Sequence, residues 1–257
     1  MKLLGDYHTH TVYSHGTGRV MDNALVAKEK GLEEIGISDH GFSHPLYGIK
    51  KSCLDFLRLE CKEAQEKTGV RVLVGIESNF VNKSGGCDLS EDLYVKFDIF
   101  LAGAHVFVGY KDISTWWNVG VASPLVTAFG GKRGERARSF ITNMYINAIS
   151  SQPIDVLTHL DYRVFSNVKE VADCCRQFGT YVEINTKKTH MTDEQWREVY
   201  STGVNFVIGS DAHSPNRVAD IAPALELMER VGISPDRVHN LNGKPNFRFA
   251  KYKGTSL

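Results

Sequence analysis

Seven short apolar runs constrain the fold of this chain more than any other feature. They cover residues 2–10, 34–40, 70–80, 97–106, 154–159, 181–186 and 205–213. Near-continuous apolar runs are typical of parallel strands that are buried on both faces. Between most of them, apolar residues recur with helical spacing, over 21–30, 52–68, 135–151, 168–178, 192–202 and 216–231. This alternation predicts repeated βαβ units in one continuous α/β domain.

Two arrangements of such units are compatible with the pattern, an open sheet and a closed barrel. The chain lacks a Gly-x-Gly-x-x-Gly motif after its first run, which argues against a nucleotide-binding open sheet. Metal-ligand residue types end every predicted strand but one, and only a closed sheet brings that many strand ends to one mouth. We therefore predict a single barrel domain over residues 1–257, with its core at about 3–232 and a C-terminal tail at 233–257.

Histidines and carboxylates gather at the carboxyl ends of the predicted strands, where parallel α/β folds bind ligands. These residues are His8, His10, His40, Glu77, His105, His159, Asp211 and His213, and His15 follows shortly after the first run. Because residues i and i+2 of an extended strand point to the same face, Asp211 and His213 are expected to project together.

Seven imidazoles at one mouth could not all be protonated without strong mutual repulsion, whereas divalent metals bind neutral imidazole and ionised carboxylate. The number of candidate ligands exceeds what one tetrahedral ion can use. The sequence therefore predicts two or three metal ions.

Composition excludes several other classes of protein. The chain has 30 basic and 30 acidic residues, so its zero net charge argues against a nucleic-acid or membrane partner. Its start is too short and polar for a signal peptide, and no apolar run is long enough to span a bilayer. Five cysteines without a Cys-x-x-Cys pair suit reduced thiols, so we expect a cytoplasmic protein of undefined oligomeric state.

The combined set of motifs resembles the metal centre of the PHP family, which is named for polymerase and histidinol phosphatase. The matching residues are His8-x-His10, His15, Asp39-His40, Glu77, His105, His159 and Asp211-x-His213. The resemblance covers residue 3 to about residue 230 and all nine ligand positions of the trinuclear members. It implies a distorted (β/α)7 TIM-like barrel and a metal-dependent phosphoesterase that hydrolyses a small phosphate monoester, as the histidinol-phosphate phosphatases do.

The resemblance also implies which residues share an ion. One ion would take His8, His10, Glu77 and Asp211, a second would share Glu77 and add His105 and His159, and a third would take His15, His40 and His213. Zinc, manganese or iron suits this mixture of imidazole and carboxylate.

The implied reaction is attack on the phosphate ester by a hydroxide that bridges two ions, which releases inorganic phosphate. Asp211 is the candidate proton acceptor and Glu77 the bridging ligand. His213 and His40 are candidates for orienting the water that protonates the leaving group, although both are also expected to bind metal. Arg163 and Arg217 each follow a predicted ligand by four residues and are candidates for binding the phosphate, the alternative being a surface arginine or a salt bridge.

Other segments are expected to support this site. Glu183 and Asn185 share one face of the sixth strand and are expected to hold the ligands from behind. The long segment 106–138, which contains Trp116, Trp117 and a basic run at 130–136, is expected to form a lid. Outside the pattern lie His44, His190 and His239, which are expected at the surface or behind the ligands.

Three alternatives remain open at this stage. A PHP-type phosphodiesterase or exonuclease acting on nucleic acid or nucleotides is disfavoured by the zero net charge and by the lack of a polymerase region. An amidohydrolase-type zinc hydrolase also begins with His-x-His, but it needs a lysine on its fourth strand, where this chain has His105, and an eighth strand. A metal-binding barrel without activity is the least favoured.

Overall fold

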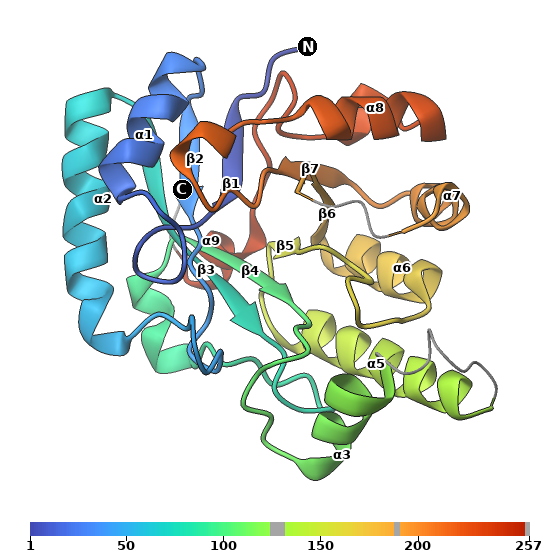
Figure 1. The fold of residues 1–257 in the computed structure, drawn as a ribbon. Helices are drawn as coiled ribbons and strands as arrows, with labels where there is room; N and C mark the ends of the chain where they lie inside the picture. Colours follow the sequence, from blue (N-terminus) through green and yellow to red (C-terminus); the bar gives the residue numbers. More distant parts are fainter. Residues whose placement is uncertain (124–131, 188–190, 255–257) are drawn as a thin grey trace.

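The computed structural model describes residues 1–123, 132–187 and 191–254. Seven parallel strands form one sheet in chain order. They are β1 (Gly5–Thr9), β2 (Glu34–Ile37), β3 (Arg71–Asn79), β4 (Ile99–Gly103), β5 (Val156–Leu157), β6 (Tyr181–Asn185) and β7 (Phe206–Gly209). The first and last strands meet where the amide of His10 donates to the carbonyl of Ala212 at 2.8 Å. The predicted (β/α)7 barrel is confirmed (Figure 1).

Helices surround the barrel, with α1 and α2 side by side along one side and α5 to α8 along the other (Figure 1). The α-helices are α1 (Val20–Glu29), α2 (Leu54–Thr68), α3 (Ile113–Thr115), α5 (Lys132–Ser151), α6 (Val168–Phe178), α7 (Asp193–Ser201), α8 (Ala222–Val231) and α9 (Arg248–Tyr252). Short helical turns are η1 (Lys51–Cys53), η2 (Glu91–Lys96), η4 (Pro215–Arg217) and η5 (Pro235–Arg237), and η3 (Trp116–Ala122) is a π-helix.

Helix α6 illustrates how local sequence sets these elements. Asn167 caps its start, where the side-chain oxygen accepts from the amide of Glu170, and Gly179 ends it in the left-handed conformation at φ 75°. Between the caps, Val171, Ala172 and Cys175 are buried against the barrel. The spacing of these residues is that of one helical face, so the sequence predicts both the helix and its buried side.

The structure differs from the sequence-based elements at two places. Strand β7 ends at Gly209, and Asp211 takes the left-handed conformation at φ 48°, so Asp211 and His213 do not continue an extended strand as expected. The helix expected from residue 216 begins only at Ala222, because the turn η4 and a left-handed Ala219 at φ 56° come first.

The amino end of the barrel is closed by the C-terminal segment. Phe247 packs with Tyr7 and Tyr181 inside the barrel, and the rings of Tyr7 and Phe247 meet edge to face with centroids 4.9 Å apart. Buried Asp155 accepts from the amides of Phe100 and Phe249 at 3.0 and 2.8 Å, and its burial raises the pKa of this carboxyl to about 7. The predicted tail is therefore packed against the barrel.

Asn240 of the same segment holds β1 and β7 together. Its amide nitrogen donates to the carbonyls of Gly5 and Ile208 at 2.9 and 2.8 Å, and its oxygen accepts from the amide of Ile208 at 2.9 Å. The side chain is completely buried. The Asn240 side chain therefore supplies hydrogen bonds that link β1 to the short strand β7 near the amino end of the barrel.

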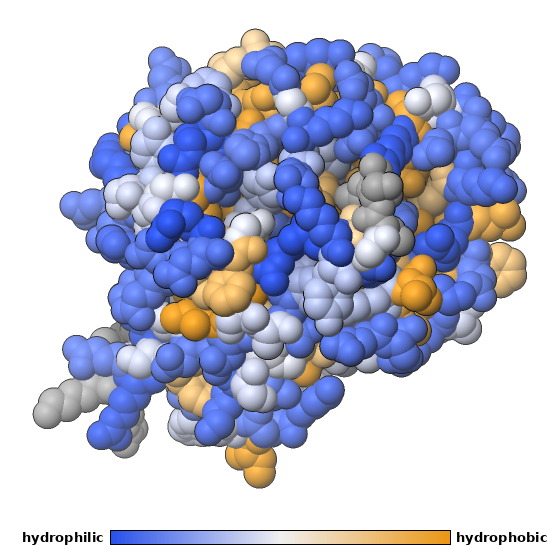
Figure 2. All heavy atoms as spheres, turned by 180° about the vertical axis from the view of Figure 1, so that it is seen from behind, coloured by the Kyte–Doolittle hydropathy of each residue, from blue (hydrophilic) through white to orange (hydrophobic). Residues whose placement is uncertain are grey.

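The surface seen from behind is mostly polar, with separate small apolar patches (Figure 2). In the ranges that the structure describes, no helix has both the length and the apolar character needed to cross a membrane.

Candidate metal centre

The nine predicted ligands lie around the carboxyl end of the barrel. Only His8 and Glu77 belong to strands, and the others follow strand ends within a few residues. The side chains of His8, His10 and Glu77 are buried, and those of His213 and Asp211 are 18% and 13% exposed toward the mouth. His8, His10 and Glu77 therefore form the deep part of the centre, while Asp211, His213 and the exposed His15 border its mouth.

Glu77 lies at the middle of the cluster. Its Oε2 is 2.8 Å from His40 Nδ1 and 3.4 Å from His8 Nε2. Its Oε1 is 2.6 Å from His159 Nε2 and 3.3 Å from His105 Nε2. One buried carboxylate thus faces imidazoles from four different strand ends, which is the arrangement expected of a bridging ligand.

Asp211 collects a second set of imidazoles. Its Oδ1 lies 3.3 Å from His10 Nε2 and 3.9 Å from His8 Nε2, and these two ring nitrogens are 3.1 Å apart. His213 Nδ1 lies 3.2 Å from the same carboxylate oxygen. The left-handed backbone of Asp211, not the alternation of a strand, brings the two residues together. Such strain at a non-glycine residue is typical of functional sites.

The ring of His15 joins this end of the cluster. Its centroid is 4.0 Å from that of His213 and 4.8 Å from that of His40, and Tyr47 stacks on it at 4.4 Å. All nine predicted residues therefore lie in one connected group.

Three subsets of ligand atoms lie within 4.8 Å of one another. They are His8 with His10 and Asp211, His40 with Glu77 and His105, and His10 with His40 and His213. The subset of His8, His10 and Asp211 agrees with the first ion that the family resemblance implies. His40 and His10 each belong to two subsets. The assignment of ligands to individual ions remains a prediction.

The charge states suit cation binding. Burial alone would raise the pKa of Glu77, but the neighbouring His8, His105 and His40 hold it well below its usual range. The same competition lowers the pKa of Asp211. Burial lowers the pKa of His105, and burial together with the neighbouring His213 lowers that of His15 to about 3. At neutral pH these two carboxylates are ionised and these two imidazoles are neutral, the forms that bind metal. Burial would lower the pKa of His8 and His159, but the neighbouring carboxylates raise it, and a cation would displace the proton from these rings.

Several buried polar atoms of the cluster also lack a hydrogen-bond partner. Within the described residues these include His10 Nδ1 and His105 Nδ1, and Glu77 Oε2, which forms no hydrogen bond but faces His40 Nδ1 at 2.8 Å. Buried polar groups are nearly always paired, so a concentration of unpaired lone pairs at one place needs an explanation. Divalent cations would satisfy the carboxylate oxygen, and the ring nitrogens placed to coordinate them are the Nε2 atoms of His8, His10 and His105, which face the carboxylates. The residues present therefore fit a centre for more than one metal ion.

Glu183 holds this cluster from behind. Its Oε1 lies 2.6 Å from His8 Nδ1, and its Oε2 accepts from the amide of His159 at 2.8 Å and from Asn185 Nδ2 at 3.1 Å. Asn185 also donates to Asp211 Oδ2 at 3.3 Å. A side chain at Gly209 would overlap Glu183, so the glycine is needed for this close approach. The two residues lie where the shared strand face predicts them.

The contact to His8 has a measurable consequence. In Glu183→Gln, the amide keeps the size of the carboxylate but removes the charge that orients His8 for metal binding. We expect metal affinity, measured by chelator competition, to fall by about 10–100-fold. The exposed Glu66→Gln on α2 is the control and is expected to bind metal as the wild type does. Wild-type affinity in Glu183→Gln would show that His8 needs no such support.

Asp39, which precedes the predicted ligand His40, plays a different part. Its carboxylate accepts from the amide of Thr11 at 2.7 Å, from the Thr11 hydroxyl at 2.6 Å and from the Ser14 hydroxyl at 2.5 Å. It therefore anchors the turn that carries His15.

The two candidate phosphate-binding arginines make their contacts elsewhere. Arg217 Nη1 pairs with Asp220 Oδ2 at 2.6 Å, which is the salt bridge considered as its alternative role. The guanidinium of Arg163 lies 5.3 Å from the ring centroid of Tyr162. Phosphate binding by either arginine remains a prediction.

The histidines outside the pattern are spread over the molecule. His44 stacks against His40 with centroids 5.3 Å apart, and burial lowers its pKa to about 4. His239 lies at the opposite end of the barrel, where its Nδ1 is 2.9 Å from the hydroxyl of Tyr181. His190 lies outside the described residues.

The segment expected to act as a lid is partly helical. The hydroxyl of Tyr110 donates to the carbonyl of His105, which ties the segment to the end of β4. Trp116 and Trp117, at the start of η3, are 52% and 54% exposed. The basic run at 130–136 lies partly outside the described residues. Its role as a lid remains a prediction.

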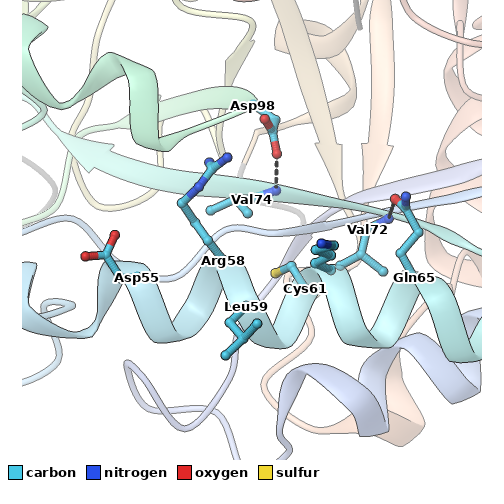
Figure 3. A pocket seen from close by; sticks show the side chains of 9 residues that line it. Asp55, Arg58, Leu59, Cys61, Gln65, Val72, Val74 and Asp98 are labelled. Carbon is cyan, nitrogen blue, oxygen red and sulfur yellow. Dashed lines mark hydrogen bonds between the residues drawn. The ribbon is translucent and has the colours of Figure 1, made fainter.

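A cavity of about 490 Å³ opens elsewhere, on the outer surface between α2 and β3 (Figure 3). Arg58 and Lys62 of α2 line it, with Val72 and Val74 of β3 and with Asp98, which accepts from the amide of Val74 at 2.9 Å. No residue of the metal cluster lines this cavity.

Sequence reasoning missed several residues that contact the cluster, among them Tyr47, Thr158 and Lys187. Lys187 is the charged one. It follows Glu183 and Asn185 at the same spacing of two, and this extension of one strand face was the available signal.

These features together define a class of protein, the α/β barrels that gather metal ligands at the carboxyl ends of their strands. Within this class the chain belongs to the PHP family, because the PHP domain family matches residues 6–187. The resemblance in the metal-ligand motifs is thus confirmed at the level of the family.

Curated relatives match over nearly their full length. A protein of Thermoanaerobacter sp. (strain X514) that is named a probable phosphatase is 29% identical, over 93% of this chain and 91% of its own. One of Shewanella loihica with the same name is 27% identical, over 99% and 96%. Among solved structures, the histidinol phosphate phosphatase of Lactococcus lactis, in complex with zinc, L-histidinol and phosphate, has a similar fold, with a TM-score of 0.59, 14% identity and coverage of 91% and 95%.

Proposed function

We propose that this protein is a metal-dependent phosphatase that hydrolyses a small-molecule phosphate monoester. The observation that carries the proposal is the convergence of four imidazoles on the buried carboxylate of Glu77, beside a second group around Asp211. Membership of the PHP family and relatives that are named probable phosphatases support it.

Two or three divalent ions, zinc, manganese or iron, would be held by the nine residues of the cluster. When bound, such ions lower the pKa of a coordinated water and withdraw charge from the phosphoryl oxygens. The implied sharing of ions is the simplest assignment, with Glu77 bridging the first two. Of the three subsets in the structure, the group of His8, His10 and Asp211 fits it directly.

The chain's own residues supply orientation and proton transfer. Glu183 and Asn185 fix His8 and Asp211 from behind, so these side chains lose little freedom when a substrate binds. Asp211 is partly exposed at the mouth beside His10 and His213, and this position suits the acceptance of a proton during hydrolysis. His213 lies beside it and, if metal leaves it free, would orient a water near the leaving group.

The charge of the chain suits a small monoester better than it suits a nucleic acid. The zero net charge of the chain provides no general attraction for nucleic acid, whose binding depends on many phosphate contacts. Histidinol phosphate is the first compound to test, because the Lactococcus lactis protein, with a similar fold, was solved with L-histidinol and phosphate.

Removal and return of metal tests the proposal. The chelated protein is expected to lose hydrolysis of p-nitrophenyl phosphate, and addition of zinc, manganese or iron is expected to restore it, because a water without metal has a pKa of about 15.7. Bis-p-nitrophenyl phosphate and single-stranded DNA serve as diester controls. If the fully loaded protein hydrolyses none of a library of monoesters, the proposal fails, and release of nucleotides from DNA alone would favour the phosphodiesterase.

A further inference from the structure

Lys187 contacts two of the predicted metal ligands although it is not a metal ligand itself. It lies two residues beyond β6, where its backbone amide donates to Asn185 Oδ1 at 2.9 Å. Its side chain crosses to the end of β7, so that Nζ lies 3.3 Å from Asp211 Oδ1 and 2.8 Å from His213 Nδ1. We propose that Lys187 binds the phosphoryl group of the substrate, an inference that rests on the proposed phosphatase function.

The position of the lysine suits contact with a ligand. The Lys187 side chain is 38% exposed, whereas Glu77 is buried, so Lys187 lies at the boundary between the mouth and the cluster. Asp211 and His213 beside it are 13% and 18% exposed, so both side chains reach the mouth. An anion that enters from solvent to meet the cluster on this side therefore passes within reach of the ammonium group.

The charge balance points to an anion as the partner of Lys187. Three carboxylates, those of Glu77, Asp211 and Glu183, contact the cluster. Two divalent ions would carry more positive charge than these three carboxylates carry negative charge. An ion that coordinates His213 would also compete with Lys187 Nζ for the ring nitrogens that Nζ now faces. An ammonium beside such a centre is stabilised when a phosphate brings negative charge to both, and lysine binds phosphate as a compact point charge.

The two arginines that the sequence suggested for this role are engaged in other contacts. Arg217 is paired with Asp220 and Arg163 lies over Tyr162. Lys187 differs from both in that it touches the side chains around which the reacting phosphate would lie. It is therefore the stronger candidate for the phosphate-binding cation.

Inorganic phosphate, the expected product, is the probe for a direct test. The zinc-loaded wild type, Lys187→Ala and Lys187→Arg are titrated with phosphate by calorimetry, and zinc content is measured by elemental analysis. Loss of a charge-assisted hydrogen bond is expected to raise the dissociation constant of Lys187→Ala by about 10–100-fold. Lys187→Arg is expected to recover most of the affinity, and zinc content is expected to stay at the wild-type value in both variants.

Lys62→Ala, on the outer face of α2, is the matched control and is expected to bind phosphate as the wild type does. Unchanged phosphate affinity in Lys187→Ala overturns the inference, and so does a loss of zinc from this variant, because Lys187 would then act on the ligands and not on phosphate. Hydrolysis of p-nitrophenyl phosphate by the wild type separates the two proposals. A wild type that hydrolyses monoesters while Lys187→Ala keeps its KM contradicts only the role of Lys187, whereas an inactive wild type contradicts the phosphatase function.

Discussion

Glu77→Gln is expected to empty most of the metal centre and to lower hydrolysis of p-nitrophenyl phosphate by about a thousandfold or more, because the stabilisation that the metals supply is lost with them. Glu77 faces imidazoles of His8, His40, His105 and His159 through its two oxygens. Glutamine has nearly the same size, but it is neutral and presents only one oxygen. No other carboxylate in the described cluster lies among these four rings.

Elemental analysis after reconstitution measures the first effect and steady-state kinetics the second. The exposed Glu66→Gln serves again as the matched control, since it makes the same chemical change on the outside of α2. Circular dichroism of both variants shows whether the fold is retained. Wild-type metal content in Glu77→Gln would contradict the central place that the geometry assigns to this carboxylate.

Asn240→Leu is expected to destabilise the fold more than any surface substitution. Leucine has the same branched shape, although it is larger, and it leaves the carbonyls of Gly5 and Ile208 and the amide of Ile208 without their present partners. Each of these three buried groups costs about 1–3 kcal/mol when left unsatisfied, so we expect the free energy of unfolding to fall by at least about 3 kcal/mol. Urea denaturation measures this change.

Asn143→Leu, at an exposed position of α5, is the control and is expected to change the free energy of unfolding by less than about 0.5 kcal/mol. If Asn240→Leu unfolds at the same urea concentration as the wild type, then the side chain does not hold β1 to β7. Activity measured in the folded fraction is expected to stay near the wild-type value, because Asn240 lies near the amino end of the strands.

The pattern of the sequence predicts the barrel and the residues that lie at its mouth. Continuous apolar strands, their alternation with amphipathic helices and the ligand-type residues after every strand but one are local properties, and parallel strands place their carboxyl ends at one edge. Seven strands in chain order confirm the first part. The nine residues do lie in one group, while their binding of metal remains a prediction.

Other features could not be predicted because they depend on backbone turns or on contacts distant in sequence. The i, i+2 rule for strands does not apply to Asp211 and His213, since β7 ends at Gly209 and a left-handed residue makes the turn. Phe247 and Asn240 pack against strands more than 30 residues away along the chain, and nothing in their local sequence marks them as barrel residues. The spacing of Lys187 places it on the strand face of Glu183 and Asn185, but its contact with Asp211 depends on the ends of β6 and β7 lying side by side.

By itself, therefore, the sequence determined the strand order, the chemical types of ligand and the end of the barrel at which they gather, because each follows from a periodicity or a motif along the chain. The tertiary structure decided which ligand atoms face one another, how the amino end of the barrel is closed and which cation borders the site. Those properties depend on distances between side chains on different strands, and such distances are determined only once the sheet has closed and its loops have taken their turns.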